Sequence, residues 1–138
     1  MVQREVADRI IAKPGDDSYG SLSVFCQYYT TPKIIVNLSR KSFYPMPKIN
    51  SSVVQFKRKE KNSDIESEDI FFKVVRSLFI SRRKQLKNNL AMSPLLGGID
   101  EKKAVEAIKL SGLSLTVRGE TLLLDQIIVL ANNIKRLL

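Results

Sequence analysis

The sequence predicts an α+β fragment, in which the last strands of a sheet are followed by a small all-α domain. Three observations favour this fold class. Alternating apolar residues typical of strands occur before residue 60, and apolar residues recur at spacings of three and four from Ser67 to the end. Between these parts, residues 57–64 are polar and without periodicity, as expected of a linker. We therefore expect two domains, residues 1–62 and residues 63–138.

The first domain is expected to contain one short helix and three strands. Helical spacing covers residues 5–12 and a turn follows at residues 14–17, whereas alternation predicts strands at residues 22–28, 33–38 and 52–57. The first of these strands has apolar residues on both faces, which requires a covering layer on each side. One short helix is too little for that. We therefore expect the edge of a larger sheet whose other strands are missing.

A loop with two prolines, residues 43–50, immediately precedes the last expected strand. Pro45 and Pro47 fix their own φ angles and restrict the residue before each to extended geometry. Such a stiff loop holds the ring of Phe43 and the cation of Lys48 at fixed positions, which suits a flat base beside a phosphate. The alternative is a proline-rich turn in which Phe43 merely fills a core.

The second domain is expected to consist of four to five short helices. Their apolar patterns cover residues 70–79, 82–90, 101–110 and about 123–137. Ser81 and Asp100 are the expected N-caps of the second and third helices, and Gly112 is the expected stop of the third. Ser93-Pro94 and Gly97-Gly98 are expected to break the chain between them.

The composition excludes several kinds of chemistry. The 138 residues include no histidine and one cysteine, Cys26, so a zinc site of the usual kinds and a Ser-His or Cys-His nucleophile are excluded, and no metal is expected. The formal net charge of +9 indicates an anionic partner, and charge alone leaves RNA, DNA and an acidic membrane surface open. No apolar run approaches the roughly 18 residues that span a bilayer. With its single cysteine, the chain is expected to be cytoplasmic.

The positive charge is concentrated in one segment of the second domain. From residue 73 to residue 87 there are six cations and no acid, namely Lys73, Arg76, Arg82, Arg83, Lys84 and Lys87. On a continuous helix, Lys73, Arg76, Arg83 and Lys87 would form one stripe that neutralises phosphates. Asn88 and Asn89 could add hydrogen bonds to sugars or base edges. The alternatives are a solvated helix face or a basic helix on a membrane, although the segment lacks the exposed Trp that favours membranes.

Several stretches occur in an order typical of one enzyme family. They are Met1–Ile10, Pro14-Gly15, Tyr19–Val24 with Gln27, Phe43-Tyr44-Pro45-Met46-Pro47-Lys48-Ile49-Asn50-Ser51, Arg82–Leu90 and Arg118–Leu122. Through them the chain resembles the C-terminal half of a small-subunit ribosomal RNA adenine dimethyltransferase, of the kasugamycin-resistance family. The proline block and the Arg-Arg-Lys block are the most specific. Departures are Met46, Ile49-Asn50, Gly119 and Leu123, the last of which stands where a capping Ser is usual.

The resemblance implies a fold and an activity. The strands would be the last of a Rossmann-like methyltransferase sheet, and the helical domain would bind rRNA. The full-length enzyme would use S-adenosylmethionine to dimethylate two adjacent adenines near the 3′ end of small-subunit rRNA. Phe43 would stack on the flipped adenine and Lys48 would shape its pocket. The candidate RNA-binding residues are Lys73, Arg76, Arg82, Arg83, Lys84, Lys87 and Asn88.

The family's glycine-rich cofactor loop and Asn-Leu-Pro-Tyr motif are expected to lie before Met1. Asn37-Leu38-Ser39-Arg40 lacks the proline and the aromatic ring of that motif. We therefore expect a fragment that holds no S-adenosylmethionine and transfers no methyl group alone, and whose open sheet edge allows self-association. The alternatives are a non-catalytic ribosome-assembly or transcription factor on the same scaffold, and a macrolide-resistance methylase that acts on a large-subunit adenine.

Overall fold

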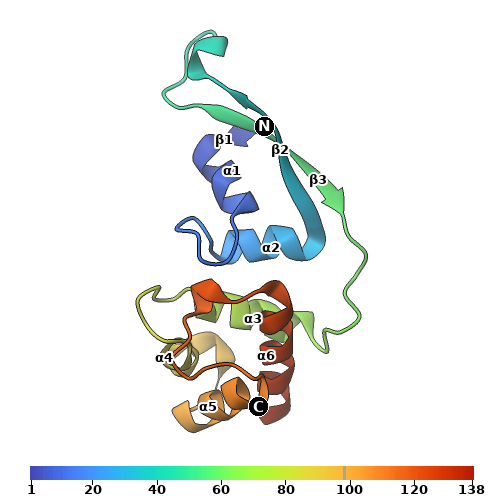
Figure 1. Cartoon of the computed structure of the whole chain (residues 1–138), viewed down its shortest axis with the longest axis vertical. Coiled ribbons are helices and arrows are strands. Elements are labelled where there is room, and N and C mark those ends of the chain that lie inside the picture. The colour runs from blue at the N-terminus through green and yellow to red at the C-terminus, as the bar shows by residue number, and fades with distance from the viewer. Residues whose placement is uncertain (98) are drawn as a thin grey trace. The chain divides into compact units, whose positions relative to one another are not determined.

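The computed structural model describes residues 1–97 and 99–138, which form two compact units (Figure 1). We call residues 1–61 the sheet unit and residues 62–138 the helical unit. Part of the expected break at Gly97-Gly98 lies outside the described residues. The assignment of the two units to a methyltransferase domain and an rRNA-binding domain stays a prediction.

The sheet unit is built on a long hairpin. Strands β2 (Thr30–Leu38) and β3 (Ser51–Arg58) are antiparallel, with Lys33 opposite Gln55 and an irregularity between Ile34 and Val36. The short strand β1 (Val2–Gln3) pairs with the start of β3, so the sheet order is β1-β3-β2. The strands expected at residues 33–38 and 52–57 are therefore confirmed. The Rossmann-like assignment is not tested, because this antiparallel sheet has only three strands in the described residues.

The strand expected at residues 22–28 is wrong, because this segment is a helix. Helix α1 (Arg4–Ile11) ends with carbonyl groups that have no partner within the helix, as every helix does. Helix α2 (Ser21–Tyr29) supplies donors for them: the Gln27 amide donates to the Ile10 carbonyl at 3.0 Å and to the Ala12 carbonyl at 2.7 Å, and the Ser23 hydroxyl donates to the Arg9 carbonyl. A spacing of four residues places both donors on one face of α2. These contacts override the local alternation.

The helical unit contains four α-helices in its described residues, packed around one apolar core. They are α3 (Glu68–Leu78), α4 (Leu86–Met92), α5 (Glu101–Leu110) and α6 (Leu124–Leu137). Asp100 caps α5 as expected, accepting from the Lys103 N–H at 2.8 Å, and Gly112 follows α5 with a φ of 72°. The fully buried core includes Phe71, Leu78, Leu86, Leu90, Ile108, Leu122, Ile127, Leu130 and Ile134. Leu110, expected on the apolar side of α5, is 61% exposed.

Helix α4 begins later than the sequence indicates. The expected helix from Arg82, capped by Ser81, is wrong at its start, because residues 82–85 do not belong to a helix and α4 starts at Leu86. The Leu86 N–H bonds to the Val117 carbonyl at 2.8 Å, instead of continuing a helical ladder. The single cationic stripe from Lys73 to Lys87 is therefore wrong, because its members lie on α3, on the turn and on α4. No helix in the described part of the chain is long and apolar enough to cross a membrane.

Candidate nucleic-acid interface

The loop between β2 and β3 is held at both ends. We call residues 39–50 the proline loop. Its first turn is the 3₁₀-helix η1 (Arg40–Ser42), where the Ser39 hydroxyl accepts from the Lys41 N–H at 3.3 Å. Asn50 closes the loop: its side-chain Oδ1 accepts from the Arg40 N–H at 2.9 Å, and its carbonyl accepts from the Arg4 N–H at 3.0 Å. Sequence reasoning missed this role of Asn50, although Asn commonly bonds nearby backbone in turns.

Phe43 and Tyr44 differ in exposure. Phe43 is half-buried, so its ring is neither sealed in the core nor free in solvent. Tyr44 is fully exposed, and the Tyr44–Pro45 peptide bond is cis. Phe43 has extended backbone angles, φ −119° and ψ 148°.

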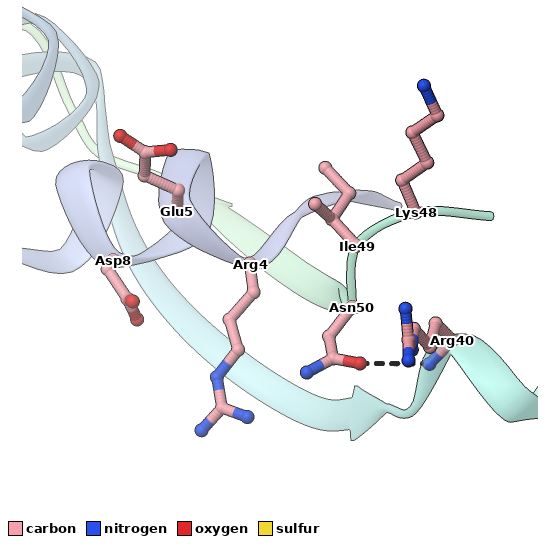
Figure 2. A pocket seen from close by; sticks show the side chains of 7 residues that line it. All are labelled: Arg4, Glu5, Asp8, Arg40, Lys48, Ile49 and Asn50. Atoms are coloured by element: carbon pink, nitrogen blue, oxygen red, sulfur yellow. Dashed lines mark hydrogen bonds between the residues drawn. The ribbon is translucent and has the colours of Figure 1, made fainter.

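A pocket of about 460 Å³ lies beside the proline loop and the start of α1 (Figure 2). Its lining residues are Arg4, Glu5, Asp8, Arg40, Lys48, Ile49 and Asn50. Figure 2 shows the Lys48 ammonium group directed away from the Arg4 guanidinium group. Phe43 does not belong to the lining, so the pocket brings Lys48, but not Phe43, together with these residues. The lining carries both charge signs: three of its residues are cations, and Glu5 and Asp8 are carboxylates. Glu5 forms an ion pair with Arg9 at 3.0 Å.

The sheet unit has a second charge feature that sequence reasoning overlooked. No acidic residue occurs between Asp17 and Glu60. The same span contains the cations Lys33, Arg40, Lys41, Lys48, Lys57, Arg58 and Lys59. The sequence indicates this positive charge through a long span without acidic residues, because the cations themselves are not clustered. A one-signed hairpin attracts polyanions along its whole length.

The candidate RNA-binding residues of the helical unit fall into two groups. Lys73 on α3 and Arg82 in the turn already have ion pairs, with Asp69 at 2.8 Å and with Glu120 at 3.1 Å. The others are solvent-exposed or half-exposed: Arg76 on α3, Arg83 and Lys84 in the turn, and Lys87 and Asn88 on α4. The structure therefore brings Arg82, Arg83 and Lys84 together on one turn.

The expectation that Asn89 forms hydrogen bonds to RNA is wrong. Its side chain is fully buried, and its amide donates to the Leu78 carbonyl at 3.1 Å and to the Ser81 carbonyl at 2.9 Å. Asn89 therefore shapes the turn that carries the cations. Gly119 packs closely against Leu78: a Cβ added to Gly119 would be 2.8 Å from the Leu78 carbonyl oxygen. This packing positions the next residue, Glu120, which forms the ion pair with Arg82.

Burial affects two titratable groups of the sheet unit, the thiol of Cys26 and the phenol of Tyr19. Burial raises the pKa of the Cys26 thiol, which keeps it protonated and unreactive at neutral pH. Burial also raises the pKa of Tyr19 to about 12. Among the residues described, no group of three or more His, Cys, Asp or Glu side chains could hold a metal ion.

Comparison with known proteins finds a matching family and relatives that share one name. Residues 1–110 match the model of a family described as ribosomal RNA adenine dimethylase. Relatives named ribosomal RNA small subunit methyltransferase A occur in Geobacillus thermodenitrificans, 41% identical over 96% of this chain, and in Streptococcus sanguinis, 41% identical over 98%. The chain covers 45% and 47% of those two proteins, so it spans slightly less than half their length.

Solved structures with the same fold include two methyltransferases. A dimethyladenosine transferase from Plasmodium falciparum superposes with a TM-score of 0.78 at 22% identity, over 93% of this chain and 53% of that one. The 23S rRNA methyltransferase ErmE gives 0.59 at 17% identity, over 96% and 52%. At these identities the likeness shows the shared fold alone. Because the family model matches residues 1–110 of 138, the chain belongs to the ribosomal RNA adenine dimethylase family.

Proposed function

We propose that this chain is the C-terminal part of an S-adenosylmethionine-dependent rRNA adenine-N6,N6-dimethyltransferase. Its substrate is the small-subunit rRNA, at two adjacent adenines near the 3′ end, and its location is cytoplasmic. The observation that carries the proposal is the family match, together with relatives at 41% identity that are named for the small subunit. The 138 residues alone bind no cofactor and transfer no methyl group, whereas a longer protein that contains them does.

The sheet register supports a larger, Rossmann-like sheet in that longer protein. Val2 pairs with Ser52 and Gln3 with Ser51, so β1 runs antiparallel along β3. Residues placed before Met1 in the same register would lie opposite Val54 and the residues after it. This edge of β3 has no partner strand among the described residues beyond β1. A strand that continues β1 towards the N-terminus would therefore extend the sheet without disturbing the hairpin.

In the proposed enzyme, Phe43 stacks on the flipped adenine and Lys48 shapes the surrounding pocket. Flipping a base costs a few kcal/mol, and one stacking contact of about 1–3 kcal/mol offsets part of this cost. The half-exposed ring on a loop tied down by Asn50 supports this role, because a preorganised ring loses little freedom on binding.

In the proposed enzyme, the helical unit binds the rRNA backbone. Arg76, Arg83, Lys84, Lys87 and Asn88 are open to solvent and can contact phosphates directly. Arg82 either keeps its ion pair with Glu120 or exchanges that carboxylate for an RNA phosphate. Lys73 has the same two options, with Asp69 as its present partner. Phosphate contacts position an RNA without reading its sequence.

The test of Phe43 is its replacement in the longer protein. We expect Phe43→Ala to lower the rate of methyl transfer to immature small subunits by about 5- to 150-fold, equivalent to one lost stacking contact. Affinity for the subunits should change little, because phosphate contacts dominate binding. Phe43→Tyr, which keeps a stacking ring, should restore most of the rate. Unchanged turnover in Phe43→Ala would contradict the proposed role.

The test of the helical unit is a double charge removal. Arg82→Ala combined with Arg83→Ala should weaken binding to small subunits and flatten the plot of log affinity against log salt by about one to two units. The matched control is Lys102→Ala with Lys109→Ala, which removes the same charge from α5. Equal loss in both variants would mean that the effect is one of net charge only.

The non-catalytic nucleic-acid-binding factor is the second candidate, because the exposed cations Arg76, Arg83 and Lys84 could bind RNA with or without methyl transfer. Assays of the longer protein distinguish these two candidate functions. Tight binding to small subunits without transfer from labelled S-adenosylmethionine would favour the binding factor. Transfer to large-subunit rather than small-subunit rRNA would instead favour the macrolide-resistance type of methylase.

A further inference from the structure

Tyr44 is the most exposed large hydrophobic side chain of the proline loop. Its exposed area is 102% of its reference value, so the whole ring is in solvent. The other tyrosines of the chain are engaged: Tyr19 and Tyr28 are buried, and Tyr29 makes an edge contact with Phe25 at 5.3 Å between ring centres. Tyrosine rings are enriched at interfaces, because an amphipathic ring supplies a large contact area together with a polar hydroxyl.

The loop that carries Tyr44 is preorganised. Pro45 and Pro47 restrict its backbone, and hydrogen bonds to Ser39 and Asn50 fasten its two ends. A ring on such a loop loses little conformational freedom when a ligand stacks on it. The loop is therefore suited to a rigid platform rather than to a flexible tip.

The charge around the ring indicates the class of ligand. Arg40, Lys41 and Lys48 are exposed on the same loop, and no acid occurs between Asp17 and Glu60. Aromatic rings interleaved with cations bind single-stranded nucleic acid, in which bases stack and phosphates are neutralised. Phe43 is half-buried and Tyr44 is fully exposed, so the two neighbouring rings differ in how much of their surface a ligand can reach.

We propose that Tyr44 is a second stacking platform, which takes an unpaired nucleotide flanking the one held by Phe43, with Lys41 and Lys48 beside the phosphates. The proposal rests on the proposed function, because it assigns a further subsite for the same rRNA. It predicts that the enzyme binds a short single-stranded stretch rather than one extruded base.

The absence of tryptophan from the sequence makes a direct test possible. Tyr44→Trp introduces a single fluorescent reporter into the 138-residue chain. Adding an unstructured, adenine-rich RNA oligonucleotide should quench its emission at least about twofold, because a stacked base quenches indole. The matched control is Tyr29→Trp, a reporter on α2 of the same unit whose position is 42% exposed, and its emission should not change. RNA binding is measured separately from the anisotropy of labelled RNA, and circular dichroism checks that each variant is folded.

A second measurement uses affinity. Tyr44→Ala should weaken binding of the short oligonucleotide by about fivefold or more without changing its salt dependence. Stacking is a larger share of the affinity here than for a whole subunit, because a short single strand makes few phosphate contacts. Tyr44→Phe should restore the affinity. If RNA binds while the emission of the Tyr44→Trp variant and the affinity of the Tyr44→Ala variant are both unchanged, the stacking inference is wrong and the proposed RNA binding stands. If no RNA binds, both fail. A response of the Tyr44→Trp reporter to vesicles of phosphatidylcholine and phosphatidylserine, with none to RNA, would overturn the inference in favour of a membrane surface.

Discussion

Asn89 determines the shape of the cationic turn from inside the helical unit. Its amide donates to the carbonyl groups of Leu78 and Ser81, which lie at the end of α3 and at the start of the turn. The Asn89 Oδ1 atom is itself buried without a hydrogen-bond partner among the described residues. The unfavourable burial of this one acceptor is therefore offset by two hydrogen bonds that hold the turn.

Replacing this side chain tests its role. We expect Asn89→Ala to lower the free energy of unfolding by about 1–3 kcal/mol, because two carbonyl groups each lose a donor. The neighbouring Asn88 is exposed on the same helix, so Asn88→Ala should stay within about 0.5 kcal/mol of the original. Urea denaturation followed by circular dichroism measures both. Equal stability of the two variants would show that Asn89 does not hold the turn.

At the scale of elements, the segment before α3 is fastened to the last helix. The Asn132 side chain donates to the Asp64 carbonyl at 2.7 Å and accepts from the Glu66 N–H at 3.1 Å. The Glu66 carboxylate forms ion pairs with Arg136 and, at 3.8 Å, with Lys135. These contacts fix where the chain enters the helical unit, and they join residues as much as 70 positions apart in sequence.

The Glu66 contacts predict a pH dependence. The hydrogen bond from Arg136, aided by the charges of Arg136 and Lys135, lowers the pKa of Glu66 below its ordinary 4.5. The unfolded state then binds the proton first, so the stabilisation is present above pH 4.5 and is lost as pH falls through the folded-state pKa. We expect the stability difference between the original chain and Glu66→Gln to shrink below that pH and in high salt.

The control for this pH dependence is a double-mutant cycle. Adding Arg136→Gln to Glu66→Gln should cost little more than Glu66→Gln alone, because the pair is already broken. Thermal unfolding at a series of pH values supplies the four stabilities. A stability difference that persists unchanged through acid pH would mean that the ion pair contributes nothing.

At the scale of the whole molecule, the hairpin leaves sheet edges open. The described sheet pairs β3 with β1 only at Ser51 and Ser52, and β2 is the last strand on the other side. Phe56 on β3 is 47% exposed, and Ile35 on β2 is 52% exposed. Open edges with exposed apolar side chains favour pairing with another chain.

We therefore expect the isolated chain to self-associate through this sheet. Sedimentation velocity should show a weight-average mass that rises with protein concentration. Phe56→Lys, which adds a charge at the exposed edge, should move the equilibrium towards monomer, whereas Leu110→Lys on the exposed face of α5 should not. A monomer at all concentrations would refute the prediction.

Much of the architecture could be predicted because its causes are local. The capping carboxylate of Asp100, the positive φ of Gly112 and the alternation of residues 52–57 act over a few neighbouring residues, and all three can be recognised in the sequence. The family is predicted from several stretches in order, of which the proline block and the Arg-Arg-Lys block are the most specific, and the match over residues 1–110 confirms it. Caps, turns and strand alternation depend on the types of neighbouring residues, so they can be predicted from the sequence.

Only the tertiary structure decided the rest, because its causes join distant segments. Residues 22–28 alternate like a strand but are helical, since Gln27 reaches the carbonyl groups at the end of α1. Helix α4 starts at Leu86 because the Leu86 N–H bonds to Val117, and Asn89 is buried because its amide serves Leu78 and Ser81. Hydrogen bonds between residues 8 to 31 positions apart leave no periodic pattern along the chain. The tertiary structure therefore decides which donors remain available for RNA.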